Sequence, residues 1–196
     1  YNPTRLSNLK NELETIGISP SLITSMTEIK QLIKEAKKSG LDVSCSVSVN
    51  NLYHTDDALQ RFDSNFKLRP PLRTKEDVKA LLKGLKEGVI DGVTSNHNPK
   101  TIEDKQVEFD NAAFGSIGLE SCFGALHSQV DLETSVQAFQ GLKKRFGIRT
   151  HAIEEGNRAD LTLFNPTNTY TFTEAHIIST SKNAAMLQQA LKGKAY

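Results

Sequence analysis

The sequence predicts an α/β fold in which parallel strands are joined by crossover helices. Two stretches of the chain support this prediction. In each of them, a segment whose apolar residues recur with the period of a helix comes before a short segment that is typical of a strand. Residues 27–38 precede residues 43–49, and residues 74–88 precede residues 89–95. Helix and strand in this order and at this spacing are typical of βαβ units in a parallel sheet. A closed (β/α)8 barrel needs about 250 residues, so these units correspond to about half of one.

The first helix is expected from Thr27 to Lys38. Its apolar residues recur at intervals of three and four, which places them on one face: Ile29, Leu32, Ile33 and Ala36. Ser25 or Thr27 can cap its start, and Gly40 can close its end in a left-handed conformation. Residues 43–49 then alternate with a period of two and predict a strand.

The second unit repeats this order. Thr74 begins a helix with Asp77 at the third position after it, a weaker form of the capping box, and Gly88 ends it. Its apolar face comprises Val78, Leu81, Leu82 and Leu85. Residues 89–95 form the next predicted strand, and residues 118–127 and 132–146 are predicted as two further helices.

The two ends of the chain are less regular. Residues 161–164 and 170–172 predict a pair of short strands around the turn 165–168, a small β element outside the sheet of parallel strands. The spacing of Leu6, Leu9, Leu13 and Ile16 indicates one short helix, and Ser19-Pro20 indicates a break. Residues 21–24 fit either a strand or a loop. The chain opens on Tyr1 rather than Met and reads as part of a longer product.

Composition excludes several classes of function. The chain carries 24 Lys+Arg and 23 Asp+Glu, so it has no strongly basic field for nucleic acid. No apolar run approaches the ~20 residues that a membrane helix needs, and no signal segment opens the chain. Cys45 and Cys122 match no CxxC pattern, which suits a reducing cytoplasm, and each is expected to be a small buried apolar residue.

Many short motifs occur in order between residues 27 and 194. They include residues 63–74 (Asp-Ser-Asn-Phe-Lys-Leu-Arg-Pro-Pro-Leu-Arg-Thr), 88–91, 95–100, 103–105, 108–109, 113–115, 117–120, 153–161, 181–183 and 191–194. Together they resemble the C-terminal part of the dihydroorotases of the longer, bacterial type, in the amidohydrolase superfamily.

This resemblance implies a fold and an activity. It implies the C-terminal part of a (β/α)8 amidohydrolase barrel in residues 1–150, and an incomplete return to a small composite β domain in residues 151–196. The family hydrolyses or closes the cyclic amide of dihydroorotate in pyrimidine synthesis, usually with one or two zinc ions at the C-terminal mouth of the barrel. Zinc lowers the pKa of bound water and polarises the carbonyl, while a carboxylate on the last strand takes the proton.

The sequence departs from the family at several of these positions. The family's Asp-His-Ala-Pro-His reads Asn96-His97-Asn98-Pro99-Lys100, so a neutral amide replaces the carboxylate that binds metal and acts as base. The family's His-x-Ser-Thr ligand motif aligns near Ile23, and the first histidine is His54. Its Glu-Val-Thr-Pro-His-His-Leu reads as residues 46–52, Ser-Val-Ser-Val-Asn-Asn-Leu.

The candidate site follows from these positions. Asn96 stands at the catalytic position, and the expected substrate-binding residues are Arg69, Lys100, Phe114 and Gly115, with no metal ligand in the chain. Arg69 replaces a substrate-binding Asn, and Lys100 replaces a substrate-binding His. These two cations either bind an anion at the mouth or are solvated. His97 is expected to have a structural role, and residues 103–105 are expected to be a solvated helix start.

Two functions remain open on the sequence. The first is a dihydroorotase homologue with absent or substoichiometric zinc and little or no activity, retained as a structural or regulatory partner of aspartate transcarbamoylase or of itself. The alternative is an active cyclic-amide hydrolase that acts on a small anionic pyrimidine precursor through metal ligands upstream of this chain.

Overall fold

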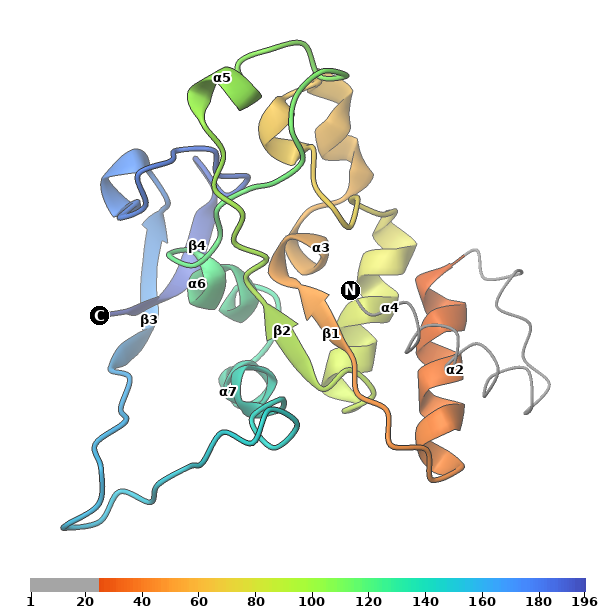
Figure 1. Ribbon diagram of the computed structural model, residues 1–196, viewed down its shortest axis with the longest axis vertical. Helices are drawn as coiled ribbons and strands as arrows, with labels where there is room; N and C mark the ends of the chain where they lie inside the picture. Colours follow the sequence, from red (N-terminus) through yellow and green to blue (C-terminus); the bar gives the residue numbers. More distant parts are fainter. Residues whose placement is uncertain (1–24) are drawn as a thin grey trace.

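The computed structural model describes residues 25–196 of the chain (Figure 1). The short helix expected around residues 6–16, the segment 21–24 and Ile23 lie outside the described residues. The described part holds a parallel pair of strands, β1 and β2, and a separate antiparallel pair, β3 and β4. No described helix is long and apolar enough to cross a membrane.

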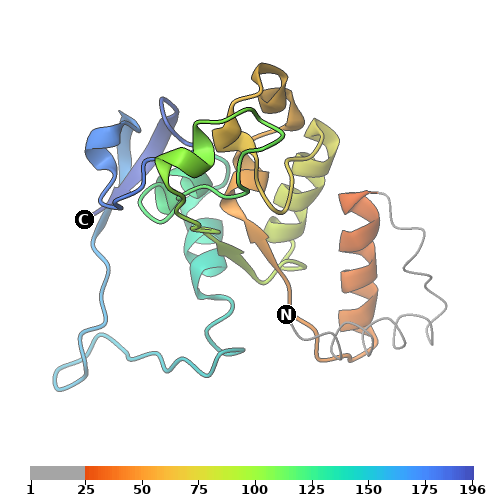
Figure 2. The same ribbon diagram turned by 45° about the horizontal axis from the view of Figure 1, so that its top comes forward.

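The first predicted helix is confirmed as α2, Met26–Lys38. The Ser25 hydroxyl accepts a hydrogen bond from the Glu28 N–H, and the Glu28 carboxylate accepts one from the Ser25 N–H, which completes a capping box. Gly40 follows the helix end with φ of 81°, the left-handed conformation that glycine adopts without strain. Figures 1 and 2 show α2 packed alongside α4.

The strand expected at residues 43–49 is correct in place but shorter, because β1 spans only Ser46–Ser48. At Cys45 the carbonyl oxygen still accepts from the Asp91 N–H at 3.0 Å, but the Cys45 N–H donates to the Asp91 carboxylate at 2.8 Å, so a side chain replaces one of the two backbone partners there. At the other end, Val49 begins the short helix α3, Val49–Tyr53. β1 pairs in parallel with β2, Gly92–Thr94, which confirms the predicted parallel order.

The second predicted helix is confirmed as α4, Lys75–Lys86. The Thr74 hydroxyl caps it by accepting from the Asp77 N–H at 3.3 Å. The Asp77 carboxylate does not complete a capping box with Thr74; it accepts instead from the Met26 N–H at 2.8 Å and from Arg73 Nε at 2.9 Å. The start of α4 is therefore tied to the start of α2.

Two later helices are shorter than predicted. α6 spans Cys122–His127 and α7 spans Leu132–Gln140, whereas the sequence predicts helices over 118–127 and 132–146. α6 begins late because the N–H groups of Gly118 and Leu119 donate to the His97 ring. α7 ends where Gly141 packs directly on the Asp91 carbonyl oxygen, which a Cβ at this position would overlap. The remaining short helices are η2 (Asp56–Arg61), η3 (Ser64–Phe66), α5 (Ile102–Lys105) and η4 (Glu174–His176).

The prediction of two short strands around the turn 165–168 is wrong. Residues Phe164–Thr171 form one strand, β3, which pairs antiparallel with β4, Ala190–Ala195. The Asn165 side-chain oxygen accepts from the N–H groups of Thr167 and Asn168 at 3.0 and 3.2 Å, and the strand register shifts there. The turn-forming residues therefore make a bulge within one strand.

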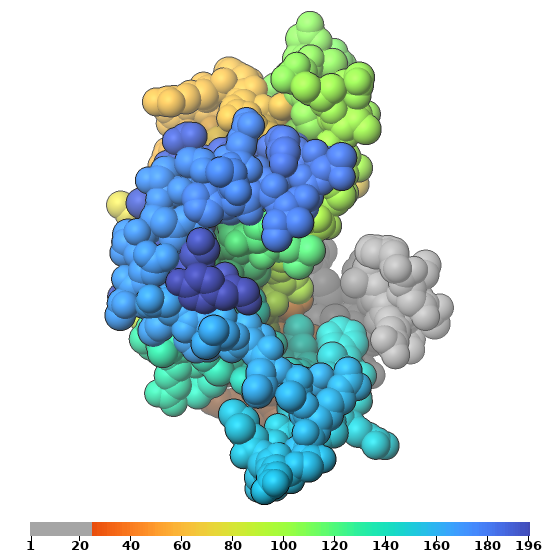
Figure 3. All heavy atoms as spheres, turned by 90° about the vertical axis from the view of Figure 1, so that its left-hand side faces the viewer, coloured from red at the N-terminus to blue at the C-terminus, as the bar shows by residue number. Residues whose placement is uncertain are grey.

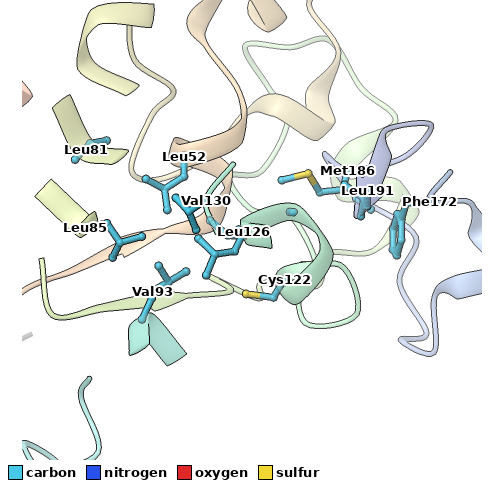
Figure 4. Packing of buried hydrophobic residues seen from close by; sticks show 14 of the residues in the cluster. Leu52, Leu81, Leu85, Val93, Cys122, Leu126, Val130, Phe172, Met186 and Leu191 are labelled. Carbon is cyan, nitrogen blue, oxygen red and sulfur yellow. The ribbon is translucent and has the colours of Figure 1, made fainter. Parts of the chain in front are cut away.

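One hydrophobic core joins the barrel elements to the β3–β4 sheet. It includes Leu85 of α4, Val93 of β2 and Leu126 of α6, together with Phe172, which follows β3, and Leu191 of β4 (Figure 4). Leu126, Phe172 and Leu191 are fully buried. The antiparallel sheet is thus packed on α6. The division of the chain at residue 150 stays a prediction.

Candidate functional site

The candidate site lies where β1 and β2 end. Carboxyl ends of parallel strands meet at one edge of a sheet, which is the edge that carries the active site in (β/α)8 barrels. Residues 49–54 follow β1 and residues 95–100 follow β2. The segments 64–70 and 113–116 lie against the second of these, as the contacts below show.

Asn96 is held by a backbone group. Its backbone has φ of 47°, a left-handed conformation that Asn tolerates better than most residues. Its side-chain Nδ2 donates to the carbonyl oxygen of Arg69 at 3.0 Å. Half of the amide is therefore engaged in holding the loop that carries Arg69, and the other half is a neutral oxygen that cannot act as a base near neutral pH.

Arg69 and Phe114 are in contact. The Arg69 guanidinium carbon lies 4.6 Å from the centre of the Phe114 ring, and Lys67 Nζ lies 4.9 Å from the same centre. Lys67 also donates to the carbonyl oxygens of Phe109 and Asp110 at 2.7 and 2.8 Å. The structure thus brings Arg69, Asn96 and Phe114 together, with two cations on one aromatic ring.

Gly115 is required for close packing of this loop. It has φ of 139°, and a Cβ there would lie 2.7 Å from Asn98 Nδ2. The Asn183 side-chain amide donates to the carbonyl oxygens of both Asn98 and Gly115 at 3.3 Å. Asn183 is buried and was not among the predicted site residues, because nothing near it in sequence shows that it bridges two distant loops.

The structure does not bring Lys100 and Arg69 into contact. Among the described residues 25–196, no interaction joins the two side chains. The Lys100 N–H donates to Asn183 Oδ1 at 3.1 Å, and its carbonyl oxygen accepts from the Ser181 hydroxyl at 2.7 Å. Lys100 and Asn65 both line a cavity of about 640 Å³. Arg69 instead lies over Phe114, so the two cations do not form one binding site by direct contact.

His97 has the structural role that the sequence analysis expects. Its Nδ1 accepts from the N–H groups of Gly118 and Leu119 at 3.2 and 3.3 Å, so this nitrogen carries no proton. The 3.9 Å separation from Glu120 Oε2 is therefore not an ion pair. Burial alone would raise the pKa of Glu120, but hydrogen bonds from the Ser179 hydroxyl and N–H outweigh it and lower that pKa.

The buried face of α3 carries polar atoms that lack a partner among the described residues. They are both amide atoms of Asn50, the side-chain oxygen of Asn51 and Nε2 of His54. Burial lowers the pKa of His54 to about 4, against the opposing effect of its hydrogen bond to the Ala185 backbone. This ring is therefore neutral at pH 7. By resemblance to the family, Asn50 and Asn51 stand at the positions of two histidines, but the sequence does not predict that His54 lies close to them.

Lys105 corrects the expectation that residues 103–105 form a solvated helix start. Glu103 and Asp104 are exposed, but Lys105 is only 5% exposed. Its Nζ donates to the carbonyl oxygens of Ser64, Ala113 and Gly115 at 2.5, 2.9 and 3.1 Å. The charged end is thus satisfied by three backbone groups, which joins η3 to the loop that carries Phe114.

The residues present at this edge do not fit a zinc site. Zinc in proteins is held by Cys, His, Asp and Glu, with at least three protein ligands. In the described range, no group of three or more such residues could hold a metal ion. Asn50 and Asn96 are neutral amides, and Asn96 donates to a carbonyl through one end. These residues by themselves therefore support no zinc-dependent step.

The two cysteines are free and are not activated. Cys122 is buried, and burial raises its pKa to about 12. Cys45 is half-buried, and burial together with the Asp91 charge raises its pKa also. Cys122 matches the expected small buried residue, and Cys45 matches it in part. Neither thiol is a nucleophile at neutral pH.

Comparison with known proteins identifies relatives by sequence. No family model matches the chain. A dihydroorotase from Carboxydothermus hydrogenoformans is 38% identical over 177 residues, which cover 86% of this chain and 41% of that protein. The chain thus spans about two fifths of the length of the curated relatives it matches.

Comparison with solved structures identifies the fold. The L-hydantoinase (dihydropyrimidinase) from Arthrobacter aurescens superposes with a TM-score of 0.76 at 24% identity, over 87% of this chain and 41% of that one. An inactive dihydroorotase-like domain of a CAD-like multifunctional protein from Chaetomium thermophilum gives a TM-score of 0.60 at 16% identity, over 98% and 52%. These are amidohydrolase barrels, which confirms the predicted fold class. The chain is therefore homologous to the C-terminal part of the dihydroorotases.

Proposed function

We propose that this chain belongs to a dihydroorotase-like protein of pyrimidine biosynthesis that has little or no hydrolase activity and serves as a structural or regulatory partner. The partner is aspartate transcarbamoylase or a second copy of the chain, in a reducing cytoplasm. Zinc is absent or substoichiometric. The homology to dihydroorotases supports the pathway, and the state of the barrel mouth supports the loss of activity.

Asn96 carries this proposal. Hydrolysis of a cyclic amide needs a group that takes a proton from water, and an amide has no basic lone pair for that purpose. Here the amide is also engaged with the Arg69 carbonyl. Asn50, at the position of a family histidine, is buried with a neutral amide. A fold neighbour that is named an inactive dihydroorotase-like domain supports the idea that this fold persists without activity.

The alternative function is an active cyclic-amide hydrolase that takes its metal ligands from residues upstream of this chain. The sequence identity between this chain and proteins named dihydroorotase favours this alternative function. Its substrate would be a small anionic pyrimidine precursor, with Arg69, Lys100, Phe114 and Gly115 as its contacts. The two functions differ in metal content and in the role of Asn96, and the next two predictions test these differences.

The purified protein is expected to contain well below one zinc ion per chain. The position of the family's metal-binding carboxylate carries Asn96, whose neutral amide binds zinc weakly, and the family's His-x-Ser-Thr ligand motif aligns near Ile23, whose alkyl side chain cannot bind metal. The measurement is elemental analysis of metal per chain before and after chelator treatment. The dihydroorotase of Carboxydothermus hydrogenoformans, prepared in the same way, is the control. One tightly held, chelator-sensitive zinc per chain would contradict the proposal.

The substitution Asn96→Asp is expected to leave dihydroorotate hydrolysis at background. It restores a carboxylate but not the imidazoles, and residues that act as a unit are strongly non-additive. The variant also loses the hydrogen bond to the Arg69 carbonyl, which is exposed, and we expect this loss to cost about 0.5–1.5 kcal/mol of stability. The assay is turnover in both directions with added zinc. Asn168→Asp, which makes the same chemical change far from this edge, controls for charge, and turnover by Asn96→Asp alone would favour the alternative function.

A further inference from the structure

Arg69 is an exposed cation whose charge is not paired in the described part of the chain. Its contacts among residues 25–196 are the stacking of its guanidinium on Phe114 and the hydrogen bond from Asn96 to its carbonyl oxygen. The N–H donors of the guanidinium have no acceptor there. Figure 3 shows α5, in green, beside η2, in orange, at the end of the molecule where these loops gather.

The loops around Arg69 hold the stacked guanidinium in place. The Gly115 N–H donates to the Lys67 carbonyl oxygen at 3.0 Å, which ties the loop that carries Phe114 to the segment that carries Arg69. Asn96 Nδ2 donates to the Arg69 carbonyl oxygen at 3.0 Å from a third loop. A guanidinium stacked on an aromatic face keeps its N–H donors in its own plane, where they remain available to a ligand.

Lys67 is the second cation on this ring, but most of its donors are used. Its ammonium group has three N–H donors, and two of them bind the carbonyl oxygens of Phe109 and Asp110. Lys67 therefore adds positive charge beside Phe114 and also ties down the neighbouring loop. Arg69 is the cation of this pair whose hydrogen-bond donors all lack an acceptor among the described residues.

The charge at this edge differs from the family pattern in a consistent direction. By resemblance to the family, Asn96 replaces a carboxylate and Arg69 replaces a neutral amide, so one negative charge is lost and one positive charge is gained. In the family, zinc supplies positive charge at this edge, whereas the residues described here do not fit zinc. Arg69, in contact with Asn96, supplies positive charge at this edge without a metal ion.

We propose that this edge binds a small carboxylate ligand without a metal ion, and that Arg69 is the residue that recognises the carboxylate. A guanidinium pairs with a carboxylate through two parallel hydrogen bonds. The side-chain oxygen of Asn96, which has no partner among the described residues, can accept from an amide N–H of the same ligand. The ligand class is thus a small molecule that carries both a carboxylate and an amide. This inference rests on the proposed function, because it takes the site to be poor in zinc.

Calorimetric titration of the intact protein in the presence of a chelator tests the proposal. The probes are dihydroorotate and dihydrouracil, which has the same ring without the carboxylate. Dihydroorotate is expected to bind, and dihydrouracil is expected to bind about tenfold to a hundredfold more weakly, because it offers no charged acceptor to Arg69. Absence of binding by dihydroorotate, or equal binding of the two probes, would overturn the proposal.

Substitution of Arg69 assigns the binding to this residue. Arg69→Asn, which restores the residue of the family, is expected to weaken dihydroorotate binding by about the same factor. Arg69→Lys keeps the charge but loses the paired hydrogen bonds, so a smaller loss is expected. Arg149→Asn is the matched control, since Arg149 is also exposed but lies in the segment after α7. Unchanged binding by Arg69→Asn would contradict the assignment.

Turnover and zinc dependence, measured on the same samples, separate this inference from the proposed function. Binding without turnover supports both. Binding in the presence of chelator together with turnover overturns the proposed function and leaves the role of Arg69 intact. Absence of both binding and turnover overturns this inference alone. Binding that requires added zinc also overturns it, because the positive charge would then come from the metal ion.

Discussion

Replacing Lys105 by methionine is expected to lower the free energy of unfolding by about 1–3 kcal/mol. The methionine side chain fills similar space but leaves the Ala113 carbonyl oxygen without its donor, whereas the Ser64 and Gly115 carbonyl oxygens keep hydrogen bonds from the Lys67 N–H and the Asn183 amide. A buried polar group left unpaired costs about 1–3 kcal/mol. Chemical denaturation of wild type and variant measures the difference. Lys79→Met, on the exposed side of α4, is the matched control and is expected to change stability by less than about 0.5 kcal/mol.

The pH dependence of this difference provides a second test. Burial lowers the pKa of Lys105 to about 8; the nearby Lys67 and Lys100 lower it further, and Asp63 opposes them. Between pH 8 and the ordinary lysine range near 10.5, the unfolded chain therefore binds more protons at this residue than the folded one. Stability rises with pH wherever this holds, so the advantage of wild type over Lys105→Met should grow across that range. If the stability difference between wild type and Lys105→Met becomes smaller over this pH range, the hydrogen bonds to the three carbonyl groups keep Lys105 protonated in spite of its burial.

Replacing Leu85 by alanine is expected to cost about 2–5 kcal/mol of stability. Leu85 is 6% exposed and belongs to the cluster that also holds Val93 and Leu126 (Figure 4). Truncation removes buried methyl groups and leaves a cavity that the surrounding helices fill only in part. Thermal or chemical unfolding gives the value.

Lys100→Ala is the contrasting variant for this experiment. Lys100 is half-buried and lines a cavity that opens to solvent, so removal of its side chain is expected to change stability by no more than about 0.5 kcal/mol. A cost for Leu85→Ala as small as that for Lys100→Ala would mean that α4 is not packed on the common core. A large cost for Lys100→Ala would show that this side chain has a structural partner, and would weaken its assignment as a substrate contact.

The sequence by itself determined those helices and strands whose periodicity, caps and end residues all lie within one short segment of the chain. α2 and α4 have regular apolar faces, N-caps at Ser25 and Thr74, and glycines after their ends, so their predicted bounds agree closely with the structure. The parallel order of β1 and β2 follows from the helix between them. The motifs from residue 27 to residue 194 indicated the family. The identities of residues 50, 96 and 100 predict, without a structure, that the chemistry of the site differs from that of the family.

Tertiary structure decided the features that depend on groups far apart in sequence. β1 is short because the Asp91 carboxylate binds the Cys45 N–H, and β3 is one strand because β4, some 20 residues later, offers it a partner. Lys105 is buried only because three carbonyl groups from two other segments converge on it. Periodicity and capping report local preference alone. A hydrogen bond between distant segments stabilises the arrangement in which both the donor and the acceptor are paired. The sequence of one segment alone therefore does not predict the effect of that hydrogen bond on the structure.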